Sequence, residues 1–155
     1  MKIWLRPAVD ADAQFCLSTG LSLDSETYDA PANIDAMLSM IRHDRVFVTA
    51  VSEKSGERYA DVGFVSVRQI NRWHIYISEL AIGQPFQGRG IGELVFDMTI
   101  SMLMADGFTK FTLHTHPENV PALRIYESFG FVTLSHCRSY GRRRTPRLFM
   151  RMSVD

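Results

Sequence analysis

Residues 87–92 read Gln-Gly-Arg-Gly-Ile-Gly, with three glycines at alternate positions, and a helical pattern follows directly. The first amides of a helix lack hydrogen-bond partners and carry a partial positive charge, and glycine permits a positive φ and a close approach by an anion. The segment therefore predicts a backbone cradle for a diphosphate. It matches neither a Walker loop nor the dinucleotide pattern G-x-G-x-x-G. A tight turn without a ligand is the alternative that the glycines alone leave open.

Glu79 is a lone carboxylate in the apolar stretch 74–82, which is typical of a buried strand. Burial disfavours the charged form of a carboxyl group, so the pKa of Glu79 is expected to rise. The side chain could then act as a general base, directly or through a water molecule. The alternative is an ordinary carboxylate at a strand end, paired with an arginine.

His114 and His116 alternate along a second strand-like stretch, with Glu118 close behind. They could supply a second base or contact a substrate, and a His-x-His pair can also belong to a metal site. No spacing of a third and fourth ligand accompanies them, so we predict no metal site. We expect histidines that are satisfied by structural hydrogen bonds.

Hydrophobic periodicity and turn residues place these side chains on a mixed α/β framework. Asp10 and Asn119 are the predicted caps of the first and last helices, and Gly107 and Gly130 mark the ends of the last two. A hairpin turn is expected at residues 53–57. The sequence predicts strands over 2–6, 45–52, 59–70, 74–82, 110–115, 131–137 and 147–153, and helices over about 10–20, 34–43, 91–106 and 119–129. This order indicates a single sheet layer covered by helices.

Length and composition are those of a globular chain. The 155 residues predict one domain, residues 1–155, and 46% hydrophobic with 22% charged content excludes disordered, collagen-like and disulfide-framework classes. No apolar run of about 18 residues occurs, so no membrane span is predicted. Cys16 and Cys137 are isolated thiols, which fits a reducing compartment and a cytoplasmic location.

Seventeen basic residues balance seventeen acidic ones, so the whole chain has no electrostatic footprint for nucleic acid or an anionic lipid surface. The distribution is uneven, because six arginines after Leu134 stand against Asp155 alone. A charge run such as 142–144 is usually a solvated face, although it could also steer an anionic substrate.

Two motifs in this order resemble those of the GCN5-related N-acetyltransferase (GNAT) superfamily. Gln-x-x-Gly-x-Gly at 87–92 follows Glu-Leu-Ala-Ile at 79–82, and Asn-Val-Pro-Ala-Leu-Arg-Ile-Tyr-Glu-Ser-Phe-Gly-Phe at 119–131 comes one helix and one strand later. The element order matches over nearly the whole chain. The resemblance implies a mixed, mostly antiparallel sheet of about seven strands flanked by about four helices, with two central strands splayed apart.

The resemblance also implies acetyl-CoA as cofactor. Its diphosphate would lie on the amides of the glycine turn, and its pantetheine arm along the edge of the preceding strand. Asn119 would contact the cofactor as well as cap its helix. The implied cofactor-binding residues are Leu80, Ala81, Ile82, Gln87, Gly88, Arg89, Gly90, Ile91, Gly92, Asn119 and Tyr126.

Tyr126 is the implied general acid. A phenol with an ordinary pKa of about 10 stays protonated at neutral pH and can give its proton to a departing thiolate. The alternative is a core aromatic, since Tyr126 shares an apolar helix face. Glu79 matches the base of some relatives, whereas others carry that residue further back along the strand, here near Tyr76.

The implied reaction transfers an acetyl group from acetyl-CoA to a primary amine of a small molecule, by direct attack in a ternary complex. An acetyltransferase acting on a protein or aminoacyl-tRNA amine, and a non-catalytic acyl-CoA sensor, stay open as alternatives. A cationic amine could be received by polar residues of the loop after the first helix, namely Asp24, Glu26, Tyr28 and Asp29. The expected partners are the acyl-CoA, the amine and a second copy in a homodimer, with neither membrane nor nucleic acid.

Overall fold

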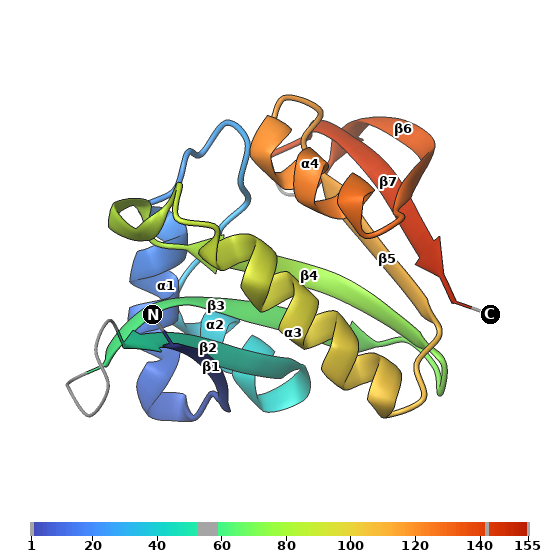
Figure 1. Cartoon of the computed structure of the whole chain (residues 1–155). Coiled ribbons are helices and arrows are strands. Elements are labelled where there is room, and N and C mark those ends of the chain that lie inside the picture. Colours follow the sequence, from blue (N-terminus) through green and yellow to red (C-terminus); the bar gives the residue numbers. More distant parts are fainter. Residues whose placement is uncertain (1, 53–58, 142, 155) are drawn as a thin grey trace.

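The computed structural model describes residues 2–52, 59–141 and 143–154. Within these residues, seven strands and four α-helices confirm the expected mixed α/β class (Figure 1). In chain order they are β1 (Lys2–Pro7), α1 (Ala13–Leu21), α2 (Ile34–His43), β2 (Arg45–Ser52), β3 (Ala60–Gln69), β4 (His74–Ile82), α3 (Ile91–Ala105), β5 (Lys110–Thr115), α4 (Val120–Ser128), β6 (Val132–Tyr140) and β7 (Thr145–Ser153).

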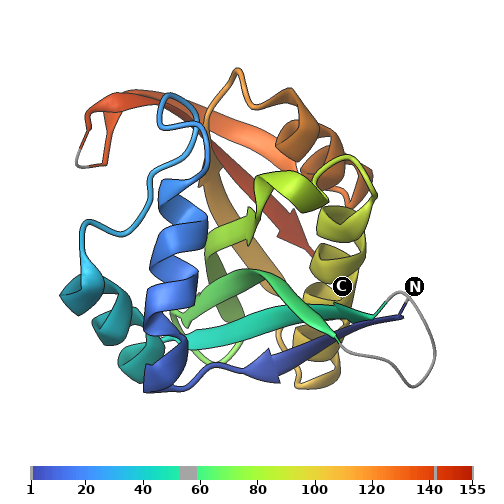
Figure 2. The ribbon, with the colours of Figure 1, turned by 90° about the vertical axis from the view of Figure 1, so that its left-hand side faces the viewer.

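The strands form one sheet in the order β1-β2-β3-β4-β5-β7-β6. Every neighbouring pair is antiparallel except β4 and β5, which run parallel. Helices α1 and α2 cover one face, and α3 with α4 covers the other (Figure 2). On the α3 side, Phe96 packs against Tyr126 and Phe131, while Met37 and Phe64 are buried on the α1 side. The two faces therefore have separate apolar cores.

Strands β4 and β5 part in the middle of the sheet. Their pairing covers only residues 74–77 with 110–113. Beyond this junction β4 continues beside β3, and the end of β5 stays with β7. The expected splay of two central strands is confirmed, and it leaves the far half of β4 with one unpaired edge.

A β-bulge in β4 lies where the strands part. The pairing of β4 with β3 skips Ser78, between Ile77 and Glu79. An extra residue reverses the alternation of side chains along a strand. Ile77 packs in the α3 core, whereas Ala81 packs in the α1 core, and Glu79 shares the face of Ala81. The bulge thus turns Glu79 away from α3.

Most predicted helix ends are confirmed. The Asn119 side chain accepts the Ala122 amide at 3.4 Å, and Gly130, with φ of 90°, closes α4. The turn expected at 53–57 lies outside the described residues. The longest helix, α3, has 15 residues, and no helix of the described chain is long and apolar enough to cross a membrane.

The predicted cap of the first helix is wrong. A single 3-10 turn over Asp10–Asp12 precedes α1, which starts at Ala13. Asp12 therefore stands at the N-cap position of α1 without a side-chain capping bond, and its carboxylate accepts the Val9 amide ahead of the 3-10 turn at 2.8 Å. Asp10 instead pairs with Arg42 of α2 at 2.9 Å.

Candidate active site

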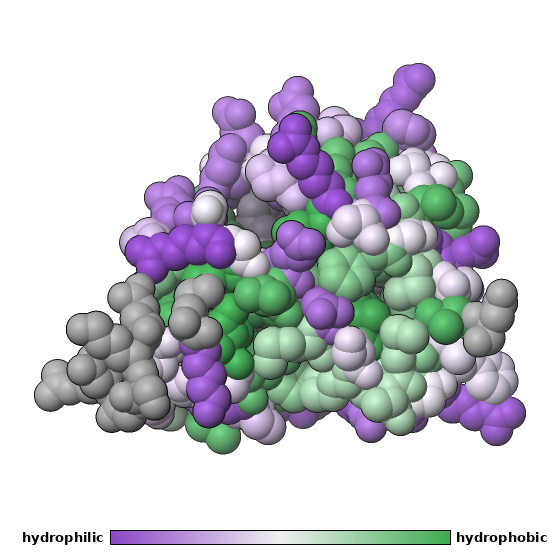
Figure 3. Space-filling view, viewed as in Figure 1, coloured by the Kyte–Doolittle hydropathy of each residue, from purple (hydrophilic) through white to green (hydrophobic). Residues whose placement is uncertain are grey.

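A cavity of about 740 Å³ fills the gap between the parted strands. It begins at the turn before α3, follows β4, and ends beneath the α1–α2 loop and the β6–β7 hairpin. Figure 3 shows a hollow above the start of α3, between that loop and α4. Pockets of roughly 300–1,000 Å³ are usual for small-molecule ligands, so the space suits a cofactor together with part of an acceptor.

The turn before α3 forms the expected backbone cradle. Gly88 and Gly90 have φ of 78° and 77°, a region that L side chains avoid, and no atom lies within 4 Å of a Cβ built at either. The first main-chain bond of α3 runs from the Leu94 amide to the Gly90 carbonyl. The amides at the start of the helix therefore point out of it without a main-chain partner, as a diphosphate requires.

Gly92 differs from the other two glycines. It has no positive φ and lies inside the first turn of α3, where a Cβ would meet Ile125 and Ile82 at 3.7 and 3.8 Å. The expectation of positive φ thus holds at two of the three glycines, since the helix has already begun at Ile91.

The free edge of β4 continues the cradle into the sheet. Beyond residue 77, β4 has backbone groups that face the gap rather than a neighbouring strand. At its end, Gln87 donates its side-chain amide to the Ile82 carbonyl oxygen at 2.9 Å and fixes the turn to the strand. An extended arm with amide groups can pair with such an edge.

Tyr126 projects from α4 into the cavity wall. Its ring packs at 5.3 Å from Phe96 and 6.0 Å from Phe131, and the side chain is buried. Within the part of the chain that the structure describes, its hydroxyl makes no protein hydrogen bond. Burial, and then the charge of Glu79, raise the pKa of Tyr126, so the phenol holds its proton at neutral pH.

Glu79 lies on the cavity wall, with its remaining exposure directed into the cavity. Burial raises the pKa of Glu79 from 4.5 to about 8, the nearby Tyr28 hydroxyl opposes this rise, and the charge of Asp29 adds to it. The Tyr28 hydroxyl lies beside the carboxylate but not in the geometry of a full hydrogen bond. No described arginine pairs with Glu79, so the alternative of an ordinary strand-end ion pair is not what the structure shows.

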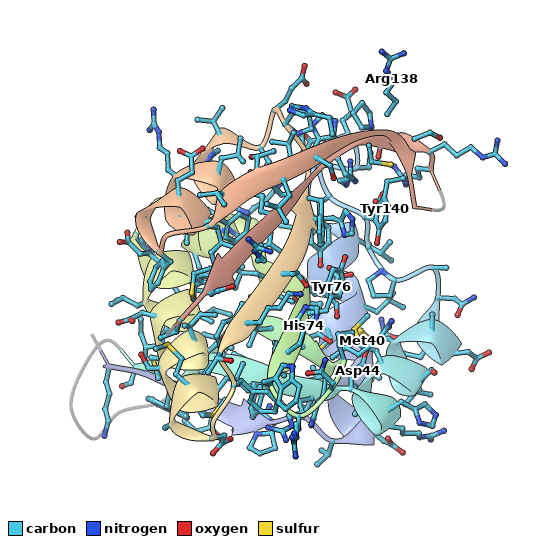
Figure 4. All side chains as sticks on the ribbon, turned by 90° about the vertical axis from the view of Figure 1, so that its right-hand side faces the viewer. Met40, Asp44, His74, Tyr76, Arg138 and Tyr140 are labelled. Carbon is cyan, nitrogen blue, oxygen red and sulfur yellow. The ribbon has the colours of Figure 1, made fainter. Side chains whose placement is uncertain are left out.

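Three rings line the acceptor end of the cavity, beneath the hairpin. The Tyr76 hydroxyl lies 2.8 Å from His114 Nδ1 and 3.2 Å from the Tyr140 hydroxyl. His114 stacks on Tyr140 with centroids 4.1 Å apart, and burial followed by the charge of Arg147 lowers the pKa of His114. Figure 4 shows Tyr140 reaching from β6 toward Tyr76. This group forms an aromatic, mostly neutral wall.

His116 has a local structural role. It is buried, and its Nδ1 accepts the Glu118 amide at 3.0 Å. Among the residues that the structure covers, no group of three or more His, Cys, Asp or Glu side chains could hold a metal ion.

The α1–α2 loop closes the acceptor end from above. Asp24, Tyr28 and Asp29 line the cavity, and the Asp29 carboxylate is already paired with Arg147 at 2.6 Å. The Asp29 carboxylate is therefore not a free anionic group of this loop. Glu26 is exposed and is not part of the wall.

The predicted cofactor residues all line the cavity except Ala81 and Arg89. The Ala81 side chain is buried toward α1, so only its backbone belongs to the free edge. The Arg89 guanidinium lies over the Phe86 ring, 5.8 Å from its centroid. Tyr140 and the buried Arg147 line the cavity as well, and neither was singled out from the sequence. For Arg147 the reason is that an arginine within a basic run carries no sign of burial.

A sequence model of the Acetyltransferase (GNAT) family matches residues 17–131. The chain belongs to this family. It is similar to N-alpha-acetyltransferase 30 of Saccharomyces cerevisiae, with 26% identity over 95 residues that cover 59% of this chain and 54% of the relative. The chain thus spans about half the length of that relative.

Two solved structures share the fold. Ard1 from Thermoplasma volcanium has a TM-score of 0.80 at 19% identity, covering 100% of this chain and 99% of the other. The yncA protein of Salmonella typhimurium, solved with its cofactor acetyl-CoA, has a TM-score of 0.75 at 17% identity, covering 100% and 95%. The resemblance stated from the two motifs is confirmed at the level of family and fold.

Gly90→Val tests the backbone cradle. A β-branched residue is strained at this φ and would crowd the diphosphate, so we expect loss of CoA binding in calorimetry. Gly107→Val is the matched control, because Gly107 has φ of 100°, lies at the other end of α3 and also has open space around it. It should lower the Tm to a similar extent and leave CoA affinity unchanged. Equal CoA affinity in both variants would contradict the assignment.

Glu79→Gln tests the environment of the carboxyl group. A pKa raised from 4.5 to about 8 means that the folded chain binds an extra proton between these values, so stability falls as the pH rises through this window. Glutamine has no carboxyl group to ionise, so the variant does not lose this part of the stability as the pH rises. We expect its Tm gain over wild type to be larger at about pH 9 than at about pH 5, as measured by calorimetry. Glu127→Gln, at an exposed position of α4, should show no such pH dependence; a pH-independent Tm gain for Glu79→Gln would rule out the raised pKa.

Proposed function

We propose that this chain is an acetyl-CoA-dependent N-acetyltransferase that acetylates a primary amine by direct attack in a ternary complex. The observation that carries the proposal is the pair Glu79 and Tyr126 on the wall of one cavity, at the point where β4 leaves β5. One group is a carboxyl with a pKa of about 8 and the other a protonated phenol. Acyl transfer to an amine needs both kinds of group.

The residues present fit acetyl-CoA. The amides that follow Gly88 and Gly90 would hold the diphosphate, and the β4 edge at Leu80–Ile82 would pair with the pantetheine arm. Asn119 caps α4 with its side-chain oxygen, which leaves its amide nitrogen for the cofactor. Bound acetyl-CoA supplies a thioester, whose C–S bond breaks as the amine nitrogen forms its bond to the carbonyl carbon.

The chain's own part in the reaction is to move two protons. Glu79, ionised above a pH of about 8 and in part below it, takes a proton from the amine nitrogen, directly or through water. Tyr126 gives its phenolic proton to the departing sulfur. The hydroxyl has no competing hydrogen-bond partner among the described residues, so it is available to the sulfur.

The first candidate acceptor is the primary amine of a small molecule. The acceptor end is roofed by the α1–α2 loop and the β6–β7 hairpin, which contact each other, so a slim molecule is favoured. Its wall combines the aromatic and apolar side chains Tyr76, Tyr140 and Met40 with the charged side chains of Asp24, Asp29 and Arg147. The apolar part of this wall favours an acceptor with an apolar group next to its amine.

The second candidate is the α-amine of a peptide. It is favoured by the similarity to the yeast N-alpha-acetyltransferase, and a peptide end is also slim enough for a roofed channel. An aminoacyl-tRNA acceptor is disfavoured, because Arg143 and Arg147 of the basic hairpin are engaged with the α1–α2 loop. A non-catalytic sensor is disfavoured by the free phenol in the wall.

A thiol-release assay with acetyl-CoA over a panel of small amines and short peptides tests the proposal. Tyr126→Phe should lower kcat by roughly 10²- to 10⁴-fold and leave CoA affinity and Tm nearly unchanged, because the ring packing is kept. Tyr59→Phe, at an exposed position, is the control and should keep full activity.

Two results would overturn the proposal. If acetyl-CoA neither raised the Tm of the wild type nor released thiol with any amine of the panel, the proposed activity would be wrong. If Tyr126→Phe kept the kcat of the wild type, the Tyr126 hydroxyl would not be the general acid. The class of amine that reacts decides between the two acceptors.

A further inference from the structure

The β6–β7 hairpin is tied to the α1–α2 loop above the cavity. Arg147 Nη2 lies 2.6 Å from Asp29 Oδ2, and Arg143 Nη1 donates to the Ser25 carbonyl oxygen at 2.9 Å. Gly141 stands behind the ion pair with φ of 74°, and a Cβ there would come within 3.1 Å of Asp29 Oδ2. We call these contacts of Ser25 and Asp29 with Gly141, Arg143 and Arg147 the hairpin clamp.

The central ion pair of the hairpin clamp is buried on its Arg147 side and half-buried on its Asp29 side. The Arg147 side chain is 5% exposed, and its Nη1 donates to the Pro146 carbonyl oxygen at 2.7 Å. Asp29 Oδ1 is buried and has no hydrogen-bond partner among the described residues. Removing one partner of such a pair leaves an uncompensated charge in a low-dielectric site, which is strongly unfavourable. The contact therefore holds the α1–α2 loop in place more firmly than a solvent-exposed ion pair would.

Tyr28 depends on this fixed loop. It precedes Asp29 in the chain, and its amide donates to the Asp24 carbonyl oxygen at 2.9 Å. The loop is thus held by its own turn at one end and by the hairpin clamp at the other. The Tyr28 hydroxyl is buried, has no hydrogen-bond partner in the described chain and lies beside Glu79.

We propose that Arg147 and Asp29 are positioning residues, whose ion pair holds the α1–α2 loop as a roof over the acceptor and keeps Tyr28 beside Glu79. This inference rests on the proposed function, in which Glu79 is the base. Arg147 of the basic C-terminal run would then act in the site by holding the α1–α2 loop, and not by steering an anionic substrate.

The charges around Glu79 make the idea testable by pH. Its carboxylate is faced by Tyr28 and Asp29 from the loop, by Tyr126 from α4 and by Tyr76 from its own strand. Asp29 raises the pKa of Glu79, and Asp29 is itself paired with Arg147. Loss of Arg147 exposes the full charge of Asp29, whereas loss of the Asp29 charge leaves a cation near the base.

Arg147→Met and Asp29→Asn form the central experiment. Both break the ion pair, so both should lower kcat/KM for the acceptor by roughly ten- to a hundredfold, with little change in acetyl-CoA affinity. The acid limb of the kcat/KM profile should move to higher pH in Arg147→Met and to lower pH in Asp29→Asn. Arg147→Lys keeps the charge and should restore most of the wild-type values. An ion pair without influence on Glu79 would leave the acid limb in place in both variants, and one that does not hold the roof would leave the acceptor kcat/KM unchanged.

Hydrogen exchange gives a readout that needs no activity. The Thr27 and Tyr28 amides, which bond to the Asp24 carbonyl oxygen, should exchange faster in Arg147→Met and Asp29→Asn than in wild type. The matched control is Arg138→Met, because Arg138 is exposed on the same hairpin and points away from the cavity (Figure 4). It should change neither the exchange nor the kinetics.

The outcomes separate the two proposals. Faster exchange in the clamp variants of a protein whose wild type transfers no acetyl group would support the clamp and defeat the proposed function. An active wild type with unchanged loop exchange, acceptor kcat/KM and pH profile in Asp29→Asn would defeat the clamp. Asp29→Asn decides the matter if Arg147→Met does not fold, because Asp29 lies on a loop near the surface, with 31% of its side chain exposed.

Discussion

The parting of β4 and β5 is the constraint on which the rest of the structure depends. A sheet normally satisfies every interior backbone group with a neighbouring strand, and an unpaired edge in its middle is unfavourable unless water or a ligand replaces the strand. Here the pairing ends at residues 77 and 113, and a cavity takes its place. The glycine turn follows directly at the end of the same strand, so both parts of one long ligand can be held by main-chain groups.

The two side chains that we propose to react come from opposite faces of the sheet. Tyr126 belongs to the aromatic core under α3 and α4, whereas Glu79 belongs to the face of α1 and α2. The bulge at Ser78 makes this possible, because regular alternation would direct Glu79 toward α3 with Ile77. The parted strands then let both side chains reach one space. One irregular residue thus converts a core position into a site position.

The local patterns of the chain predicted the elements well, since helices and strands follow short-range periodicity and capping. Strand β4, the Asn119 cap and the left-handed glycines at 88 and 90 were all predictable. The bulge was not, because register depends on a partner strand that a single segment does not reveal. The burial of Arg147 was not predictable either, since its partner lies 118 positions away in the sequence.

The two halves of the sheet meet at a junction of four residue pairs, at one end only. Strands rise about 3.3 Å per residue, so a small change of angle at the junction becomes a larger displacement at the far end of β4. Ile75 and Phe111 are fully buried partners in this junction and lie outside the cavity wall. A change in the packing of these two side chains would alter the angle at which the halves of the sheet part, and with it the width of the cavity, although neither residue touches that space.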